Sequence, residues 1–186
     1  LELLPLISEK SAALLATAIL DNTLNFTGQL TTQSDIRAYE VLARRAKLEA
    51  GWPERYLREC QATIESDLIG ALAVDMKRLK ADSNLPQVFA QMAVWDASAL
   101  IQTHRSTLAH WMAAQGEDWL LNVISISECK SYFLAEPLAS QQKLSHLLSI
   151  QWQAGMAVLE CPLLRKELLK LGLARTCVVP TSLRGS

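Results

Sequence analysis

The sequence lacks the patterns that mark several common classes of protein. It has no apolar run of the roughly 18 residues that a membrane-spanning helix needs. It also has no basic segment followed by an apolar run and a small-residue cleavage site, as a secretory signal would have. The 18 basic residues nearly balance the 19 acidic ones, so the chain offers no basic surface for nucleic acid. We therefore expect neither a membrane nor a nucleic acid as a partner.

Cysteine is scarce, and its spacing forms no recognisable site. The four residues are far apart, without a Cys-x-x-Cys pair or a histidine at metal-ligand spacing: Cys60, Cys129, Cys161 and Cys177. Buried, reduced thiols of a cytoplasmic protein explain this pattern better than a disulfide framework does. Glycine-rich phosphate loops and Gly-x-Ser-x-Gly nucleophile motifs are missing as well.

What the sequence does contain is a run of helices, followed by strands that alternate with further helices. Helical periodicity covers residues 8–20, 36–50 and 54–81, the last in two pieces joined at Gly70. Strands are expected at 88–95, 119–127, 131–135, 156–160 and 177–180, and helices at 99–115, 141–152 and 163–171. This order predicts an α/β domain, with a small mixed sheet flanked by helices, preceded by a helical segment that belongs to another domain.

Three polar clusters interrupt these elements, and the first lies at the end of the first apolar helix. The apolar residues up to Leu20 are followed by Asp21, Asn22, Thr23 and Asn25. Oxygen ligands of this kind suit Mg²⁺ or Mn²⁺. The alternative is that Asp21 or Asn22 satisfies backbone groups where the helix ends.

The second cluster is basic and follows the helical pattern of residues 54–81. Lys77 and Arg78 come directly after Asp75-Met76, shortly before the loop at Pro86. They could point at an anion. Charges at a helix end are more often a solvated face, and the helix dipole favours cations at a C-terminus in any case.

The third cluster is Arg165 and Lys166, just inside a helix opened by Pro162. Two cations at a helix N-terminus oppose the helix dipole, unless an anion shares the free N–H groups of the first turn. Arginine supplies a planar fork and lysine a point charge, which together suit phosphate oxygens. The alternative is an exposed pair neutralised by Glu160 or Glu167.

In chain order, these clusters resemble the C-terminal part of a DHH-superfamily phosphoesterase. The closest branch is that of the manganese-dependent (family II) inorganic pyrophosphatases and exopolyphosphatases. Residues 12–26 resemble the end of that family's first domain, where an apolar helix leads into a metal-binding Asp. Asp75-Met76-Lys77 and Leu164-Arg165-Lys166 resemble the Asp-Tyr-Lys and Ser-Arg-Lys elements of its second, DHH-associated domain.

The resemblance implies a phosphoanhydride hydrolase that acts on pyrophosphate or polyphosphate with Mn²⁺ or Mg²⁺. Residues 1–50 would be the remnant of the DHH catalytic domain with a linker helix, and residues 51–186 the DHH-associated substrate-binding domain. Their hinge would lie between Leu48 and Pro53. Asp21 or Asn22 would bind the metal. The phosphates would be bound by Lys77, Arg165 and Lys166. An exposed apolar first helix would also allow a homodimer.

The sequence departs from the family's pattern in three ways. Counted back from Phe26, the metal-binding Asp falls on Asn22, and Leu164 replaces a serine. Neither Asp-His-His nor His-x-Asp-x-Asp, the elements that hold most of the family's metal, occurs in the 186 residues. We therefore expect a fragment that is inactive without the missing N-terminal domain. The alternative is a non-catalytic anion-binding or regulatory module; a nucleic-acid phosphodiesterase of the same superfamily is less favoured, because no basic groove is evident.

Overall fold

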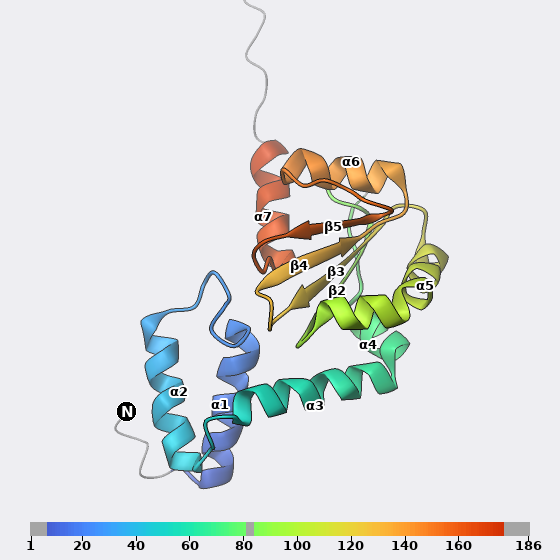
Figure 1. Ribbon diagram of the computed structural model, residues 1–186. Helices are drawn as coiled ribbons and strands as arrows, with labels where there is room; N and C mark the ends of the chain where they lie inside the picture. Colours follow the sequence, from blue (N-terminus) through green and yellow to red (C-terminus); the bar gives the residue numbers. More distant parts are fainter. Residues whose placement is uncertain (1–6, 81–83, 177–186) are drawn as a thin grey trace, which may run out of the picture.

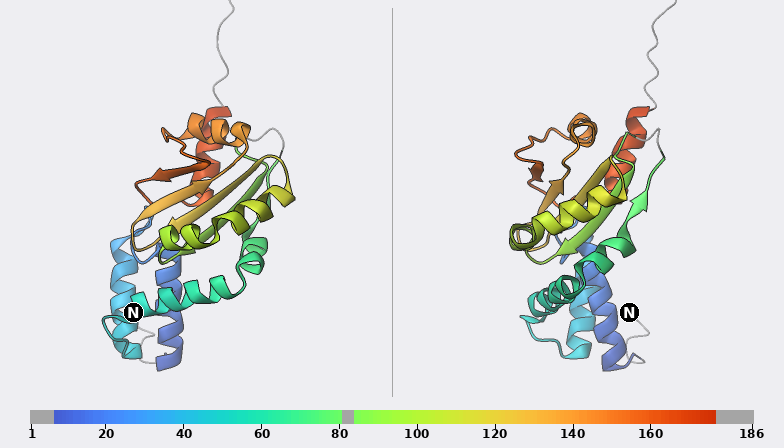
Figure 2. Two further views of the ribbon diagram at one scale, coloured as in Figure 1. Left: turned by 45° about the vertical axis from the view of Figure 1, so that its right-hand side comes forward. Right: turned by 90° about the vertical axis from the view of Figure 1, so that its right-hand side faces the viewer.

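The computed structural model describes residues 7–80 and 84–176, apart from the side chains of 173–176. Two helices, α1 (Glu9–Thr23) and α2 (Gln33–Ala46), pack against each other, and α3 (Trp52–Ser66) leads from them to the sheet (Figure 1). The pair lies at one end of the sheet, away from α6 (Leu138–Leu147) (Figures 1 and 2). The strand expected at 177–180 lies outside the described residues.

Side-chain caps set the beginnings of the two paired helices. The Ser8 hydroxyl accepts from the backbone N–H of Ser11 at the start of α1. At the start of α2, Thr32 and Asp35 form a capping box, in which the Thr32 N–H donates to the Asp35 carboxylate at 2.8 Å. Such caps satisfy backbone donors that have no partner inside the helix. This explains why the polar segment before residue 36 begins a helix.

The helical region from 54 to 81 differs from the prediction in two respects. The joint is at Asp67, not Gly70, because the Asp67 carboxylate accepts from the Gly70 N–H at 3.0 Å and caps α4 (Leu68–Asp75). A Cβ on Gly70 would lie 2.1 Å from Asp67 Oδ2, so glycine there accommodates the cap. The helix also ends at Asp75, and Lys77–Arg78 form the short strand β1.

The described part of the chain forms a five-stranded sheet in the order β1-β2-β3-β4-β5, which confirms the predicted mixed sheet. The strands after β1 are β2 (Val88–Val94), β3 (Trp119–Ser125), β4 (Lys130–Leu134) and β5 (Met156–Leu159). The parallel pair β2 and β3 is connected by α5 (Ala97–Gln115), whereas the other neighbours are antiparallel. A helix is the usual connection between adjacent parallel strands.

Each face of the sheet is covered by its own helices. One face packs against α4 and α5 through the alternate residues Val88, Ala90 and Met92. The other face carries Phe89, Leu120 and Phe133 and packs against α6 and α7 (Arg165–Thr176). We call these the α5 face and the α7 face. Because helices cover both faces of the sheet, β3 is buried along its whole length.

The predicted bounds of two helices on the α7 face are wrong at both ends. Helix α6 spans 138–147 rather than 141–152, and its cap at Leu148 is already extended. Helix α7 begins at Arg165 rather than 163 and runs through Gly172 to Thr176. Glycine lowers helix propensity by only about 1 kcal/mol, and packing can override that preference. Gly172 accordingly lies inside the helix, against Leu85.

A small apolar cluster joins the paired helices to the sheet. Leu24, at the end of α1, packs with Leu57 of α3 and with Ile124 and Ile126 of the β3 region. All four are at most 5% exposed. The polar end of α1 is thereby held beside the carboxyl end of β3. Among the described residues, no helix is long and apolar enough to cross a membrane.

Candidate functional site

The first candidate pair, Asp21 and Asn22, lies on the last turn of α1. Both side chains are exposed. Asp21 accepts hydrogen bonds from the Tyr56 hydroxyl of α3 at 3.1 and 3.0 Å. The Asn22 amide donates to the Ala18 carbonyl at 2.8 Å, one turn earlier in the same helix. The backbone role considered for Asn22 is therefore present, and Asp21 is the carboxylate that stays on the surface.

The backbone directly after this pair adopts a rare conformation. Leu24, Asn25 and Phe26 have consecutive positive φ angles of 51°, 54° and 67°. Each such residue costs about 1 kcal/mol unless its surroundings hold it there. Thr23 does so, because its hydroxyl accepts from the Phe26 N–H at 3.1 Å and its carbonyl accepts from the Gly28 N–H at 2.8 Å. The chain therefore reverses tightly after Asn22, which leaves Asp21 on an exposed edge.

These residues do not complete a metal site. Within the part of the chain that the structure describes, no three His, Cys, Asp or Glu side chains come together in a way that could hold an ion. Asp21 offers one carboxylate, already bonded to Tyr56, and the Asn22 amide is directed back to its own helix. A pair of catalytic ions needs several such ligands. The described residues thus do not by themselves complete the expected Mn²⁺ or Mg²⁺ centre.

The second and third clusters come together through Arg165 and Asp75, which are 90 residues apart. Arg165 Nη1 donates to Asp75 Oδ2 at 3.0 Å and to the Asp75 carbonyl at 2.6 Å, while Nη2 donates to Oδ1 at 2.9 Å. The Arg165 side chain is 15% exposed. Neither of the expected partners neutralises it: Glu160 pairs with Lys130 at 3.0 Å, and the Glu167 carboxylate accepts from the Leu164 N–H at 2.7 Å.

Lys77 lies on the same side of the sheet as the Arg165 guanidinium. Lys77 of β1 stands directly opposite Phe89 of β2 in an antiparallel pair, so their side chains share the α7 face. The Arg165 guanidinium carbon lies 5.9 Å from the centroid of the Phe89 ring. Lys166 is the next residue of α7 and is exposed. The neighbouring Arg78 points to the α5 face, where it donates to the Gln115 carbonyl at 3.0 Å.

The N–H groups at the start of α7 are partly occupied by protein oxygens. The Leu164 N–H donates to Glu167, as described above, and the Arg165 N–H donates to Gln91 Oε1 at 2.5 Å. The expected sharing of these groups with a bound anion is therefore limited. The cationic side chains, rather than the backbone of this turn, are the groups that could bind a phosphate.

Three polar residues that the sequence reading overlooked position this turn from inside the sheet. Asn122 of β3, fully buried, donates to the Leu163 carbonyl at 2.7 Å, and the Ser131 hydroxyl of β4 accepts from the Leu163 N–H at 2.8 Å. Gln91 of β2 is the third. Their signal in the sequence is a polar residue inside an otherwise apolar strand, where burial without a partner is costly. Among the described residues, Asn122 Oδ1 finds no hydrogen-bond partner.

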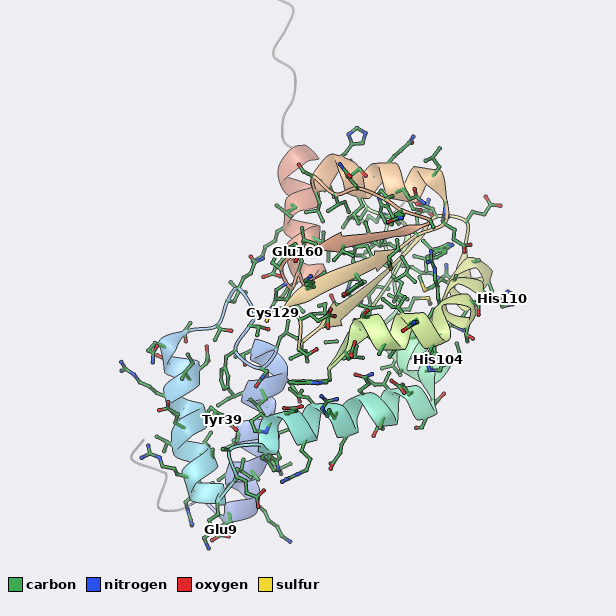
Figure 3. All side chains as sticks on the ribbon, in the orientation of Figure 1. Glu9, Tyr39, His104, His110, Cys129 and Glu160 are labelled. Carbon is green, nitrogen blue, oxygen red and sulfur yellow. The ribbon has the colours of Figure 1, made fainter. Side chains whose placement is uncertain are left out.

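Two of the three histidines lie away from this region. His104 and His110 both lie on α5, on the other face of the sheet from α7 (Figure 3). The acidic residues near the site are Asp75 and Glu167, and the basic ones are Lys77, Arg165 and Lys166. An oxyanion on the α7 face would meet these basic side chains.

Comparison with known proteins supports a relationship at the level of the fold. No protein-family model matches the sequence, and a search of curated proteins found no match. Among solved structures, the chain is similar to a Methanococcus jannaschii protein assigned to the family II inorganic pyrophosphatases, with a TM-score of 0.68 and 17% identity. The match covers 90% of this chain and 57% of that protein, so the chain spans less than two thirds of its length. The chain therefore has the mixed α/β fold of one part of a family II pyrophosphatase.

Proposed function

We propose that this chain is the phosphate-binding part of a metal-dependent phosphoanhydride hydrolase that acts on pyrophosphate or short polyphosphate. The observation that carries the proposal is the fold it shares with part of a family II inorganic pyrophosphatase over 90% of its residues. The juxtaposition of Lys77 and Arg165 around Phe89 supports the same function. A pyrophosphate carries several negative charges at neutral pH, so a cluster of cations that are not all neutralised is what its binding requires.

In this proposal, Lys77, Arg165 and Lys166 bind the phosphate oxygens and stabilise negative charge that develops on them. Lys77 and Lys166 are exposed, and neither forms an ion pair with another described residue. The Arg165 side chain, paired with Asp75, is 15% exposed. Fixed cations aimed at the transferring group are a large source of rate enhancement in phosphoryl transfer.

A metal centre would activate the attacking water, and the described residues supply only part of that centre. When bound, such ions lower the pKa of water and produce a nucleophile at neutral pH. Asp21 is the residue that we propose as this chain's ligand to it, and further polypeptide would supply the rest. The loop between α2 and α3, which includes the expected hinge at 48–53, would let the two parts close around the substrate.

A non-catalytic anion-binding module is the second candidate. It is favoured by Asn22, which occupies the place expected for the metal-binding Asp and directs its amide to Ala18. The two candidates predict the same affinity for phosphates but differ in turnover.

The test uses the natural protein at its full length together with the 186-residue chain. Phosphate release from pyrophosphate is measured with Mn²⁺ for both, and binding of imidodiphosphate to the chain is measured by calorimetry. The proposal expects turnover by the full-length protein, none by the chain, and binding by both. Binding without turnover by the full-length protein would support the regulatory module. Absence of both would exclude the two candidates together.

A further inference from the structure

The contacts of Arg165 leave one particular edge of its guanidinium free. A guanidinium has five N–H donors. Nη1 uses both of its hydrogens, on Asp75 Oδ2 and on the Asp75 carbonyl, and Nη2 uses one, on Oδ1. The remaining donors are Nε–H and the second hydrogen of Nη2. Neither has a partner among the described residues, and the side chain stays 15% exposed.

These two donors form a fork of their own. Nε–H and the outer Nη2–H lie side by side in the guanidinium plane and point in the same direction. This spacing matches two oxygens of a carboxylate or phosphate, so each edge of an arginine can bind one such group. Asp75 occupies one edge completely, and the planar geometry then fixes the direction of the other.

We propose that Asp75 is a positioning residue that presents the Nε–Nη2 edge of Arg165 to one phosphoryl group of a diphosphate ligand. This inference rests on the proposed function, because it assigns a ligand to the same cations. Asp75 does not touch the ligand; it acts through Arg165. An arginine that is already immobilised loses little rotamer freedom on binding, which improves affinity.

The surroundings of the fork indicate a ligand with two phosphoryl groups rather than one. The Arg165 guanidinium carbon lies 5.9 Å from the centroid of the Phe89 ring, and Lys77 of β1 stands opposite Phe89 in the antiparallel pair, so both cations flank the same residue. A phosphoryl group held at the fork would leave its neighbour within the range of the flexible lysine. The rigid fork of Arg165 would thus bind one phosphoryl group of the diphosphate, and the flexible Lys77 would bind the other.

Because Asp75 is charged, the direction in which its substitution changes the affinity for a diphosphate tests the inference. A carboxylate near an anion site weakens anion binding by simple Coulomb repulsion. If charge alone mattered, Asp75→Asn would tighten the binding of a diphosphate. If positioning dominates, the same variant releases Arg165 and weakens binding. The two explanations therefore predict changes in opposite directions.

The experiment measures imidodiphosphate affinity of the 186-residue chain by calorimetry. We expect Asp75→Asn to weaken binding about three- to tenfold, the range that corresponds to losing one immobilised side chain. Arg165→Lys, which removes the fork but keeps the charge, should weaken it by about tenfold or more. Asp118→Asn is the control, because it removes an aspartate from a different ion pair, the one with Lys143, and its side chain is more buried than that of Asp75, at 19% against 39% exposed. Thermal unfolding of every variant establishes that it is folded.

A second measurement follows the Arg165 Nε–H resonance by NMR during the titration. The resonance is assigned from its loss in Arg165→Lys. Imidodiphosphate should shift it downfield in the wild-type chain, and the shift should be reduced in Asp75→Asn. A variant that was merely less stable would change neither the resonance of the folded protein nor its response to the ligand.

Each outcome bears on a different statement. Unchanged or tighter binding by folded Asp75→Asn overturns the positioning role, as does binding by the wild type without a shift of the Nε–H resonance. Should the wild-type chain fail to bind imidodiphosphate at all, the proposed function is wrong for this chain, and the inference goes with it.

Discussion

The Tyr56 hydroxyl donates to both carboxylate oxygens of Asp21 and so joins α3 to the end of α1. The Tyr56 ring also stacks on Trp52, with a centroid distance of 5.2 Å and an interplanar angle of 4°. This contact fixes the side chain whose carboxylate we propose as a metal ligand. It also means that a metal ion at Asp21 would have to compete with a hydrogen bond already made.

The Tyr56–Asp21 contact predicts a pH-dependent difference between variants. Burial, then the hydrogen bonds to Cys60 and Asp21, raise the pKa of Tyr56 above its ordinary value. In Asp21→Asn the pKa of Tyr56 should fall, yet remain raised by burial. Above about pH 10, the ordinary pKa of tyrosine, Tyr56 of the unfolded chain loses its proton while Tyr56 of the folded chain keeps it. The stability that Tyr56 contributes is therefore present below about pH 10 and is lost as the pH rises. Ultraviolet titration of tyrosinate, with Tyr56→Phe as the reference, measures the shift; identical titrations of wild type and Asp21→Asn would contradict it.

Leu57→Ala should loosen the junction between the paired helices and the sheet. Leu57 is 4% exposed and packs on Leu24 and Ile124. Removing a buried leucine side chain costs about 2–5 kcal/mol, through lost burial and the cavity that remains. Urea unfolding gives the free energy of unfolding. Val74→Ala, at a side chain that is 82% exposed, is the control and should change stability by less than about 0.5 kcal/mol. Equal effects of both substitutions would show that the cluster carries no special stability.

Asn122→Asp should destabilise the fold in a pH-dependent way. The side chain is fully buried, and its amide donates to the Leu163 carbonyl. A carboxylate there would face that carbonyl without a donor, at a cost of about 2–4 kcal/mol at neutral pH. Burial raises the pKa of such a carboxyl group, so its protonated form can donate again and stability should recover as the pH falls toward about 4. Urea unfolding at several pH values tests this, with the exposed Gln142→Glu as control; a loss that does not depend on pH would contradict it.

Lys143→Met should reduce stability at neutral pH but not in acid. Lys143 Nζ lies 2.5 Å from Asp118 Oδ2. Burial alone would raise the pKa of Asp118, but Lys143, Ser140 and the Gln87 N–H outweigh it and lower that pKa. The contribution is therefore present above about pH 4 and is lost as the pH falls through the lower folded-state value. We expect about 1 kcal/mol at pH 7, against roughly 0.3–0.5 kcal/mol for the exposed ion pair between Arg58 and Glu54, which Arg58→Met removes. A Lys143→Met effect that persists in acid would refute this origin.

The strands could be predicted because their cause is local. Residues 119–125 are mostly apolar and include the β-branched Val123 and Ile124, which suits a strand covered on both faces. Helix boundaries were less predictable, since side chains decide them case by case. The helix α1 continues through Asn22 and Thr23 because both side chains donate to carbonyls one turn earlier, at 2.8 and 2.6 Å. The joint at Asp67 likewise depends on a cap that Gly70, the more conspicuous residue, merely accommodates.

The sequence predicted the candidate residues of the site, but not the partners with which they form ion pairs and hydrogen bonds. Local sequence gave Glu160 and Glu167 as the nearest acids to Arg165, whereas the partner is Asp75, which only the folded chain brings near. Gln91, Asn122 and Ser131 were missed for a similar reason. Their hydrogen bonds go to the turn before α7, and no local spacing reveals which segment will cover a strand.

The two-residue strand β1 has a consequence for how the cations are distributed. Side chains of adjacent strand residues point to opposite faces, so a slip of one residue along β2 would exchange Lys77 and Arg78 across the sheet. The bond from Arg78 to the Gln115 carbonyl opposes this slip, because it exists only in the observed register. Arg78 thus stabilises the strand register from the α5 face, where no phosphate is expected to bind. That register in turn places Lys77 on the α7 face.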